Sequence, residues 1–488
     1  MLSALIVIPL LGAILVAVLP REIAPQYVRP ITLLVLVITI VWSVLLGFKF
    51  DPAISDLQFE ENLPWIASLG LTYRLGLDGL SLPLIVLNAV LTWIAIYSTD
   101  ETIQRPQLYY FLMLLLNAGV AGAFLAQDLL LFFLFYEVEL IPLYFLIAIW
   151  GGTNRGYAAT KFLIYTALSG VIILAAFLGL NWLSGASTFD YDATRSQALP
   201  LVTQLILLGT LLVGFGIKIP LVPLHTWLPD AHVEASTPVS VLLAGVLLKL
   251  GTYGLLRFGM GLFPEAWAVL APGLATWAVV SVLYGAFTAI AQTDMKKMVA
   301  YSSIGHMGYI LLGAAAATPL SILGTVFQMI SHGLISALLF LLVGVVYKKT
   351  GTRDITILRG LLNPERGLPL IGSFMVMGVM ASAGIPGMVG FISEFLIFCG
   401  SFPVFPAQTL LCMIGTGLTA VYFLLLVNRT FFGRLPNQFS NLPTVQWAER
   451  TPALILAGII VFLGLNPAWL VHWTEVTTTA MLGTGGRG

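Results

Sequence analysis

The sequence predicts an all-α membrane protein that crosses the bilayer many times. Of its 488 residues, 59% are hydrophobic and only 9% are charged, whereas an ordinary soluble domain carries about 25% charged residues. Apolar windows of about 20 residues, long enough to cross a bilayer, recur along nearly the whole chain. No polar stretch is long enough to fold as a separate soluble domain, so we expect one membrane domain, residues 1–488.

The apolar windows predict about fourteen transmembrane helices. They begin near Leu2, Pro30, Leu80, Tyr109, Leu129, Ala158, Leu201, Val239, Trp267, Met298, Leu320, Leu368, Gln408 and Pro452. The first window has neither a basic segment before it nor a small-residue cleavage site after it, so we expect a retained helix rather than a signal peptide.

The basic residues predict which side of the membrane each loop faces. About fifteen of them fall in loops or helix ends on one side and about five on the other, and such an excess is typical of the cytoplasmic side. Both termini should therefore face the outside or the lumen. The net charge is zero and sums two separate faces; we expect lipid and protons, and no nucleic acid, to contact the chain.

Lys218 is the most informative residue, because it lies inside an apolar helix just before two prolines. A cation at a helix centre costs roughly 2.5 to 3.5 kcal/mol on insertion scales and therefore suggests function. Pro220 and Pro223 cannot donate to the carbonyls of Gly216 and Ile219. We expect the helix to break beside the ammonium and to leave bare acceptors facing a cavity, as in many ion pathways.

A second helix break is expected near residues 383–387, where Pro386 would free the carbonyl of Ser382. Glu394 follows this break. Lys218 belongs to the seventh predicted helix and Glu394 to the twelfth, so the two broken helices are five spans apart. An odd separation reverses the direction of the helix, which is typical of an inverted repeat.

The predicted fold therefore contains two inverted five-helix repeats, with helices 7 and 12 broken. The first three helices occupy about residues 1–100, the repeats about 107–260 and 265–433, and the last helix about 450–473.

Two neighbouring carboxylates, Glu137 and Glu139, lie in another apolar helix. Pro142 would deprive the carbonyl of Val138 of its helical donor, so a local helix defect is expected beside them. Two positions on a helix are about 200° apart, so the carboxylates cannot share one face. We expect Glu137 to be the pathway residue and Glu139 a helper or a subunit contact; the alternative is that Glu137 only stabilises helix packing.

Lys249 lies roughly two turns from the nearest polar helix end. Gly245, four residues earlier, leaves room for a neighbouring backbone. The alternative is that Lys249 snorkels to a membrane surface, although Arg257 already marks the end of that helix. Asp78, at the start of the third helix, is most simply a partner of the helix dipole.

Four histidines lie between these charges and could pass protons near neutral pH, namely His225, His232, His306 and His332. Each could equally be a structural hydrogen-bond donor. Gln328 and His332 are four residues apart and share one helix face.

The sequence offers little to hold a cofactor. Cys399 and Cys412 lack the spacing of an iron-sulfur or zinc site, and no Walker loop is present. A bis-histidine haem between His306 and His332 is an alternative to a hydrogen-bonded relay. We expect no cofactor and no metal in this chain.

Three segments together resemble the antiporter-like subunits of respiratory complex I and of its photosynthetic relatives. They are FGIKIPLVPLHTWLPDAH at residues 215–232, DMKKMVAYSSIGHMG at residues 294–308 and GFISE at residues 390–394. The chain is most similar to the M or chain-4 type, called D in cyanobacteria and chloroplasts, and the likeness includes YEVELIP at residues 136–142. Tyr136 stands where the family pattern has tryptophan.

The resemblance implies a fourteen-helix inverted-repeat fold and four residues for proton translocation. Glu137 and Lys218 would form a coupled carboxylate-lysine pair, Lys249 would be the central lysine, and Glu394 the terminal carboxylate at the exit side. It also implies that quinone, iron-sulfur clusters and NAD(P)H or ferredoxin are bound by partner subunits of a complex I-like assembly, and it favours a cyanobacterial thylakoid membrane.

We therefore expect a proton-translocating subunit of an NAD(P)H or ferredoxin:plastoquinone oxidoreductase. Separating Glu137 from Lys218 would release the lysine's proton, which would pass along Lys249, His306 and His332 towards Glu394. Two alternatives are a multisubunit cation/proton antiporter and a structural membrane anchor for a redox enzyme. Within the family, the sequence leans towards the variant that couples electron transfer to carbon dioxide hydration.

Overall fold

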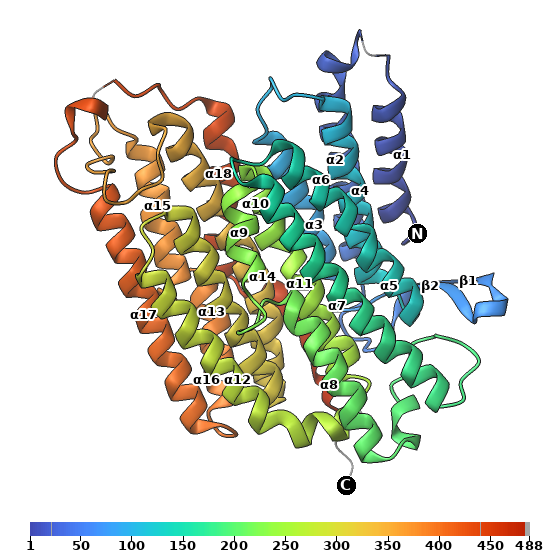
Figure 1. Ribbon diagram of the computed structural model, residues 1–488. Coiled ribbons are helices and arrows are strands. Elements are labelled where there is room, and N and C mark those ends of the chain that lie inside the picture. The colour runs from blue at the N-terminus through green and yellow to red at the C-terminus, as the bar shows by residue number, and fades with distance from the viewer. Residues whose placement is uncertain (21, 440, 484–488) are drawn as a thin grey trace.

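The computed structural model describes residues 1–20, 22–439 and 441–483, which form a helical bundle with one β-hairpin (Figure 1). Ten helices of the described residues are long and apolar enough to cross a membrane, and four shorter helices of 10–17 residues are also apolar. The predicted all-α membrane class is confirmed. The count of fourteen spans and the inverted repeats stay predictions.

The elements follow one another along the chain with short connections. In order they are α1 (Ala4–Val18), α2 (Ala24–Lys49), β1 (Gln58–Ile66), η1 (Ala67–Leu69), β2 (Leu71–Leu77), α3 (Ser81–Tyr97), α4 (Pro106–Leu125), α5 (Leu129–Val138), α6 (Leu140–Trp150), α7 (Arg155–Leu183), η2 (Arg195–Ala198), α8 (Leu201–Lys218), α9 (Trp227–Glu234), α10 (Thr237–Leu242), η3 (Leu243–Leu247), α11 (Leu248–Gly254), η4 (Leu255–Met260), α12 (Pro264–Ile290), α13 (Met295–Ala316), α14 (Pro319–Thr350), α15 (Pro369–Ser382), α16 (Val389–Ser401), α17 (Pro406–Thr430), η5 (Asn437–Phe439), α18 (Trp447–Leu465) and α19 (Ala468–Gly483).

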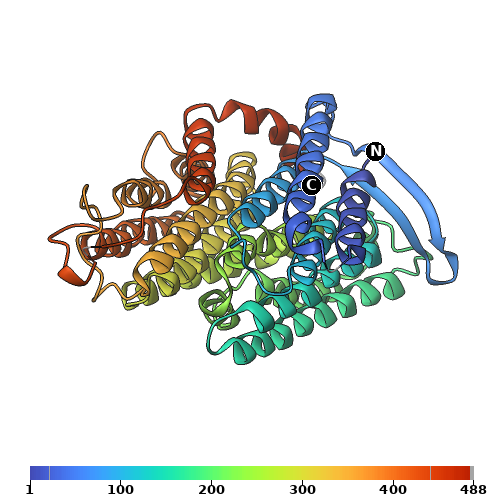
Figure 2. The ribbon, with the colours of Figure 1, turned by 90° about the horizontal axis from the view of Figure 1, so that it is seen from above.

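Every predicted helix start lies within a few residues of an observed helix, because long apolar runs indicate directly where a span lies. Two elements were not predicted. The antiparallel hairpin β1–β2 occupies a stretch expected to be a connection, and both views show it extending beyond the helices on the side of α1 and α5 (Figures 1 and 2). Helix α19 follows the last predicted span.

Three of the spans are interrupted. The break between α5 and α6 falls at Glu139, the break after α8 follows Lys218, and the break between α15 and α16 follows Ser382. All three stand beside the prolines that predicted them. Each break places a polar or charged side chain next to irregular backbone inside the bundle.

One detail of the first predicted break is wrong. The Gly216 carbonyl, one of the two expected to stay bare, is paired, because the N–H of Leu221 donates to it at 2.9 Å. The indole N–H of Trp227 donates to the Ile217 oxygen at 2.8 Å. Buried backbone acceptors are costly to leave unpaired, and the chain turns back far enough here to supply its own donors.

Two buried helical segments run side by side through the centre and carry most of the polar interior. One is the continuous stretch α10–η3–α11–η4, whose most apolar window is entirely buried, and it contacts the other, the 32-residue helix α14. The first stretch contains two π-helical turns, η3 and η4. Such turns are rare and often occur at functional sites.

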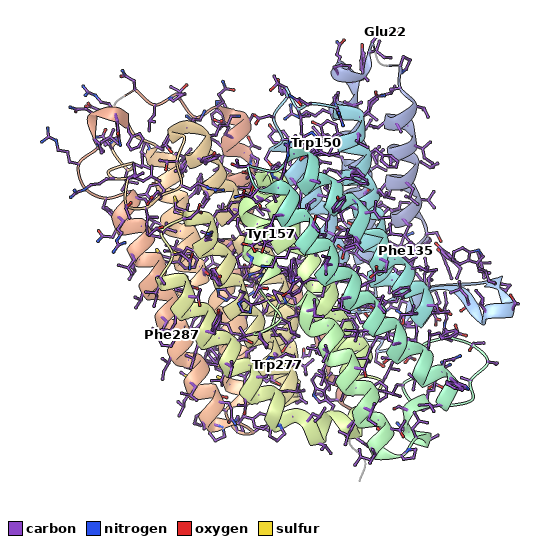
Figure 3. All side chains as sticks on the ribbon, in the orientation of Figure 1. Glu22, Phe135, Trp150, Tyr157, Trp277 and Phe287 are labelled. Carbon is purple, nitrogen blue, oxygen red and sulfur yellow. The ribbon has the colours of Figure 1, made fainter. Side chains whose placement is uncertain are left out.

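The outside of the bundle is apolar, as expected for a surface in contact with lipid. Aromatic side chains such as Tyr157 and Phe287 project outward from it (Figure 3), and their exposed fractions are 64% and 59%. A soluble protein rarely exposes so large an apolar surface.

The two ends of the bundle differ in charge. At one end, here called the basic end, Lys296 and Arg353 donate to the carbonyls of Ala235 and Val233. At the other, here called the opposite end, Gln204 at the start of α8 donates to Glu265 at the start of α12, 3.3 Å away. Figure 1 shows the basic end uppermost.

Candidate functional site

Lys218 is the last residue of α8 and is only 2% exposed. Its ammonium forms an ion pair with Glu139, which is fully buried at the break between α5 and α6. The ammonium also lies 4.8 Å from the centre of the Tyr136 ring, a cation–π distance. Two helix breaks from distant parts of the sequence therefore meet in one buried ion pair.

The direct ion pair of Lys218 is with Glu139, whereas the resemblance implies a coupled pair of Glu137 with Lys218, which stays a prediction. Glu137 is half-buried and its carboxylate lies against Gly170 of α7, where an added Cβ would come within 1.9 Å of it. Glu139 is enclosed by its own chain, so it is no subunit contact. The break at Glu139 ends the regular helix there, so helix geometry alone could not tell which carboxylate faces Lys218. The role of Glu137 in proton transfer stays a prediction.

The ion pair is held on one side only. One oxygen of Glu139 contacts Lys218, while the other is buried and, among the described residues, has no hydrogen-bond partner. A buried carboxylate with unfilled acceptor capacity is only weakly compensated for its loss of water. Among the described residues, the pair is therefore compensated through one carboxylate oxygen alone.

Lys249 is completely buried in the middle of the first central stretch, so it does not snorkel. Its ammonium donates to the Ala244 carbonyl, which lies in the π-helical turn η3, at 2.5 Å. It also lies 2.7 Å from Nδ1 of His332 on α14. The close approach of the two backbones depends on Gly333, where a Cβ would lie 2.8 Å from the Gly245 carbonyl, whereas a Cβ at Gly245 would first meet the Leu91 side chain at 2.5 Å.

A network of neutral polar groups continues from His332. The rings of His332 and His306 are 5.5 Å apart. His306 contacts Ser382 through Nε2 at 2.9 Å and the Gln328 amide through Nδ1 at 3.0 Å. Gln328 in turn accepts from Ser393 at 2.5 Å, so α13, α14, α15 and α16 all contribute.

Glu394 of α16 lies at the end of this network and is 4% exposed. One of its oxygens is 3.8 Å from Nδ1 of His306, and the other accepts a hydrogen bond from Thr416 at 3.0 Å. Gly384, in the break between α15 and α16, has a φ of +69°, and a Cβ there would lie 2.9 Å from the carboxylate. Glycine is therefore required both by the turn and by the side chain of Glu394.

A cavity of about 10 Å³ lies between these groups, lined by His306, His332, Ser382 and Glu394 among others. This volume is about what one water molecule requires. A proton could move from Lys249 to Glu394 along side chains separated by no more than one such space.

Two of the four candidate histidines lie outside this network. His225 contacts the Tyr284 ring at 4.9 Å. His232 is fully buried and stacks on Phe340 at 4.4 Å, and neither of its ring nitrogens has a hydrogen-bond partner among the described residues. A relay role for these two stays a prediction.

Both ring nitrogens of His306 are engaged, by Ser382 and Gln328, as in a hydrogen-bonded relay. The absence of haem and of other cofactors stays a prediction. Within the described residues no group of three or more His, Cys, Asp or Glu could hold a metal ion.

Sequence reasoning missed some of the polar residues that complete the site. Ser382 could have been found, since it is the residue whose carbonyl Pro386 was expected to free. Ser393 and Thr416 gave no signal, because hydroxyl residues are common in membrane helices and only the packing shows which of them contact Gln328 and Glu394.

Residues 126–419 match the family described as NADH:quinone oxidoreductase/Mrp antiporter, TM. The chain belongs to this family. The matched region contains all of the candidate site residues, so the family and the buried polar interior coincide.

Relatives and solved structures agree. The chain is 44% identical over 516 residues to NAD(P)H-quinone oxidoreductase chain 4 2 of Microcystis aeruginosa, covering 98% of this chain and 92% of the relative. It is 40% identical to the chain of the same name in Thermosynechococcus vestitus, with 98% and 91% covered. A chain of respiratory complex I from Thermus thermophilus with bound NADH superposes with a TM-score of 0.90 at 28% identity, covering 100% of both chains.

A chain of the Mrp complex from a Dietzia species superposes with a TM-score of 0.85 at 21% identity, covering 99% of both chains. At that identity the likeness shows a shared fold alone.

Proposed function

We propose that this chain is a proton-translocating, antiporter-like membrane subunit of a complex I-type NAD(P)H or ferredoxin:quinone oxidoreductase. One observation carries the proposal: a buried ion pair at two helix breaks, Lys218 with Glu139, lies in the same interior as a series of neighbouring polar side chains, Lys249, His332, His306 and Glu394. The names of the relatives supply the class of complex. The redox centres and the quinone belong to partner subunits.

The proposed step is the opening and closing of the Lys218–Glu139 pair. When the carboxylate is near, its charge favours the protonated lysine; when it moves away, burial favours loss of the proton. Moving one charge against 100 mV costs about 2.3 kcal/mol, which equals a change of roughly 1.7 pKa units. A modest rearrangement of one ion pair is therefore large enough to drive the transfer.

Lys249 is the proposed acceptor of the proton that Lys218 releases. The helices of the two lysines pack closely, since a Cβ added at Gly251 would lie 3.2 Å from Cβ of Lys218. From Lys249 the proton passes through His332 and His306 to Glu394. In this scheme Glu137, half-buried beside the pair, changes the electrostatic potential at Lys218. His225 and His232 pass protons on the side of the basic end.

The setting of the subunit is part of the proposal. Cyanobacterial relatives support a thylakoid membrane, plastoquinone as the quinone and neighbouring membrane subunits as partners. We place both termini on the lumenal side and the basic end on the cytoplasmic side, following the excess of basic residues. The variant coupled to carbon dioxide uptake is the form that we favour.

The experiment is a Lys218→Ala variant in the assembled complex in membrane vesicles. We expect reductant-driven proton uptake to disappear, because no other residue replaces the lysine of the ion pair. Electron transfer and proton uptake that both persist at the parental level would overturn the assignment. The subunits that co-purify with the parental complex identify the variant.

A cation/proton antiporter is the second candidate, favoured by the shared fold with the Mrp chain. It would exchange sodium for protons in vesicles without any reductant. A structural anchor is distinguished in the same vesicles, since neutralising its buried charges would alter assembly but leave coupling intact.

A further inference from the structure

The helix that carries Lys249 also carries two further polar residues on the same face. Lys249, Tyr253 and Arg257 follow one another at four-residue intervals and are all buried. From Lys249 to Arg257 the helix rises about 12 Å towards the opposite end of the bundle. A buried polar side chain therefore recurs at each turn from Lys249 towards the opposite end, in addition to the contact of Lys249 with His332.

Arg257 lies in the last turn of this helical stretch, as the sequence suggested, but it is only 6% exposed. Its guanidinium forms an ion pair with Asp78, and its Nε donates to the hydroxyl of Tyr253 at 3.3 Å. The guanidinium carbon lies 5.4 Å from the centre of the Tyr253 ring and 5.8 Å from that of Tyr191. The cation is thus enclosed by one carboxylate and two aromatic rings.

Asp78 is itself held in place by the start of α3. Its Oδ1 accepts from the backbone N–H groups of Leu80 and Ser81 at 3.1 and 3.0 Å, and from the Ser81 hydroxyl at 3.0 Å. The predicted interaction with the helix start is therefore present, and Oδ2 remains for Arg257. If the Asp78 carboxylate moved away from Arg257, it would break its hydrogen bonds to the first residues of α3.

The polar groups continue beyond this pair. The Tyr253 hydroxyl donates to the carbonyl of Phe124, at the end of α4, at 3.1 Å. The next segment, residues 127–128, holds the amide of Gln127 and the carboxylate of Asp128, both buried. Without a fixed positive charge, protons on Lys249 would be able to pass along these hydroxyl, carbonyl and carboxylate groups to the opposite end of the bundle.

We propose that Arg257, fixed by Asp78, is an electrostatic plug that prevents protons from leaving the first half of the bundle at the opposite end. Arginine keeps its charge at any accessible pH, and a fixed cation in a narrow polar passage repels protons, as in other selective pores. Protons on Lys249 are then directed to His332 and Glu394. The inference rests on the proposed function.

The second half has no such cation beside its carboxylate. Glu394 is contacted by Thr416 and His306, and among the described residues no lysine or arginine forms an ion pair with it. The difference fits a molecule with one open exit and one closed one.

The test measures proton leak in membrane vesicles that contain the assembled complex. A proton gradient is imposed without reductant, and its decay is followed by a pH-sensitive dye. The key variant is the double substitution Asp78→Asn with Arg257→Gln, which removes both charges together and leaves neither stranded. We expect a decay several-fold faster than in the parental vesicles, while electron transfer with reductant continues.

Two further variants control this result. Arg257→Lys keeps a positive charge and should preserve most of the tightness. Arg195→Gln removes another arginine near the opposite end, which contacts Asn181 and Thr188, and should not change the decay.

A double variant that holds the gradient as tightly as the parent would overturn the proposal. Loss of assembly in the double variant would assign the pair to folding and would overturn it as well. If Lys218→Ala stops pumping but the double variant stays tight, only the plug fails. If Lys218→Ala still pumps, the proposed function fails, whatever the leak.

Discussion

Two of the three broken spans of this chain, that of α8 and that of α15 and α16, place an ionisable group in opposite electrostatic surroundings. The break after α8 leaves a cation, Lys218, and meets a carboxylate from another broken span. The break between α15 and α16 leads to an acid, Glu394, whose contacts are a hydroxyl and an imidazole. The first break is a charged pair and the second a hydrogen-bonded network.

These two kinds of surroundings suit the two halves to different steps of proton transfer. A buried ion pair resists losing either member, because the remaining charge is then uncompensated in a low dielectric. Its opening and closing is therefore a large electrostatic event, suited to driving a transfer. A neutral network passes a proton with little reorganisation, which suits a path that only conducts.

The largest effect is expected when the carboxylate of the ion pair is removed. Glu139→Gln leaves Lys218 buried without its counter-charge, which costs roughly 3–5 kcal/mol, so we expect poor assembly and little pumping. Glu137→Gln is the matched control and should cost much less, because Glu137 is half-buried and lies outside the pair. Yield of assembled complex and proton uptake measure both; equal losses would remove the distinction between the two carboxylates.

Lys218→Arg separates the two roles of Lys218, because it keeps the ion pair but prevents release of the proton. Arginine retains the charge and can contact Glu139, yet it hardly deprotonates. We expect normal assembly and a roughly hundredfold loss of proton-coupled turnover, the scale of a lost proton-transfer group. Turnover at the parental level would show that Lys218 never gives up its proton.

Glu394→Gln tests whether the second half is indeed free of a charge pair. Since no opposite charge depends on this carboxylate, assembly should be unaffected, in contrast to Glu139→Gln. Proton uptake should fall by about tenfold, or about 1.4 kcal/mol, because an amide cannot carry the proton onward. Failure to assemble would mean that the acid is paired after all.

The smallest effect is expected for Thr416→Val, which keeps the shape of the side chain and removes its hydrogen bonds with Glu394 and with the Tyr309 hydroxyl. The bond to Glu394 contributes about 1 kcal/mol, so proton uptake should fall by less than about fivefold. Thr276→Val on α12 is the control, since Thr276 is exposed and bonds only its own helix. A loss as large as that of Glu394→Gln would make Thr416 part of the proton path.

Much of the fold could be predicted from residue types alone. Apolar runs located the helices, and Pro142, Pro220 and Pro386 located the three breaks, because an apolar span and a missing backbone N–H have the same consequence in any context. The hairpin β1–β2 was missed because β1 lacks a regular alternation of apolar and polar residues and contains a proline, although β2 does alternate. The count of spans and the repeats remain predictions.

The candidate site was predictable as a set of residues but not as a set of contacts. The sequence by itself identified the buried charges Lys218, Lys249 and Glu394, since an ionisable group in an apolar span is costly wherever it lies. Only the tertiary structure decided that Glu139 faces Lys218, that His232 stacks on Phe340 with neither ring nitrogen hydrogen-bonded among the described residues, and that Arg257 is buried against Asp78. Those pairings depend on how helices distant in the sequence rotate and pack around a break, which residue types do not specify.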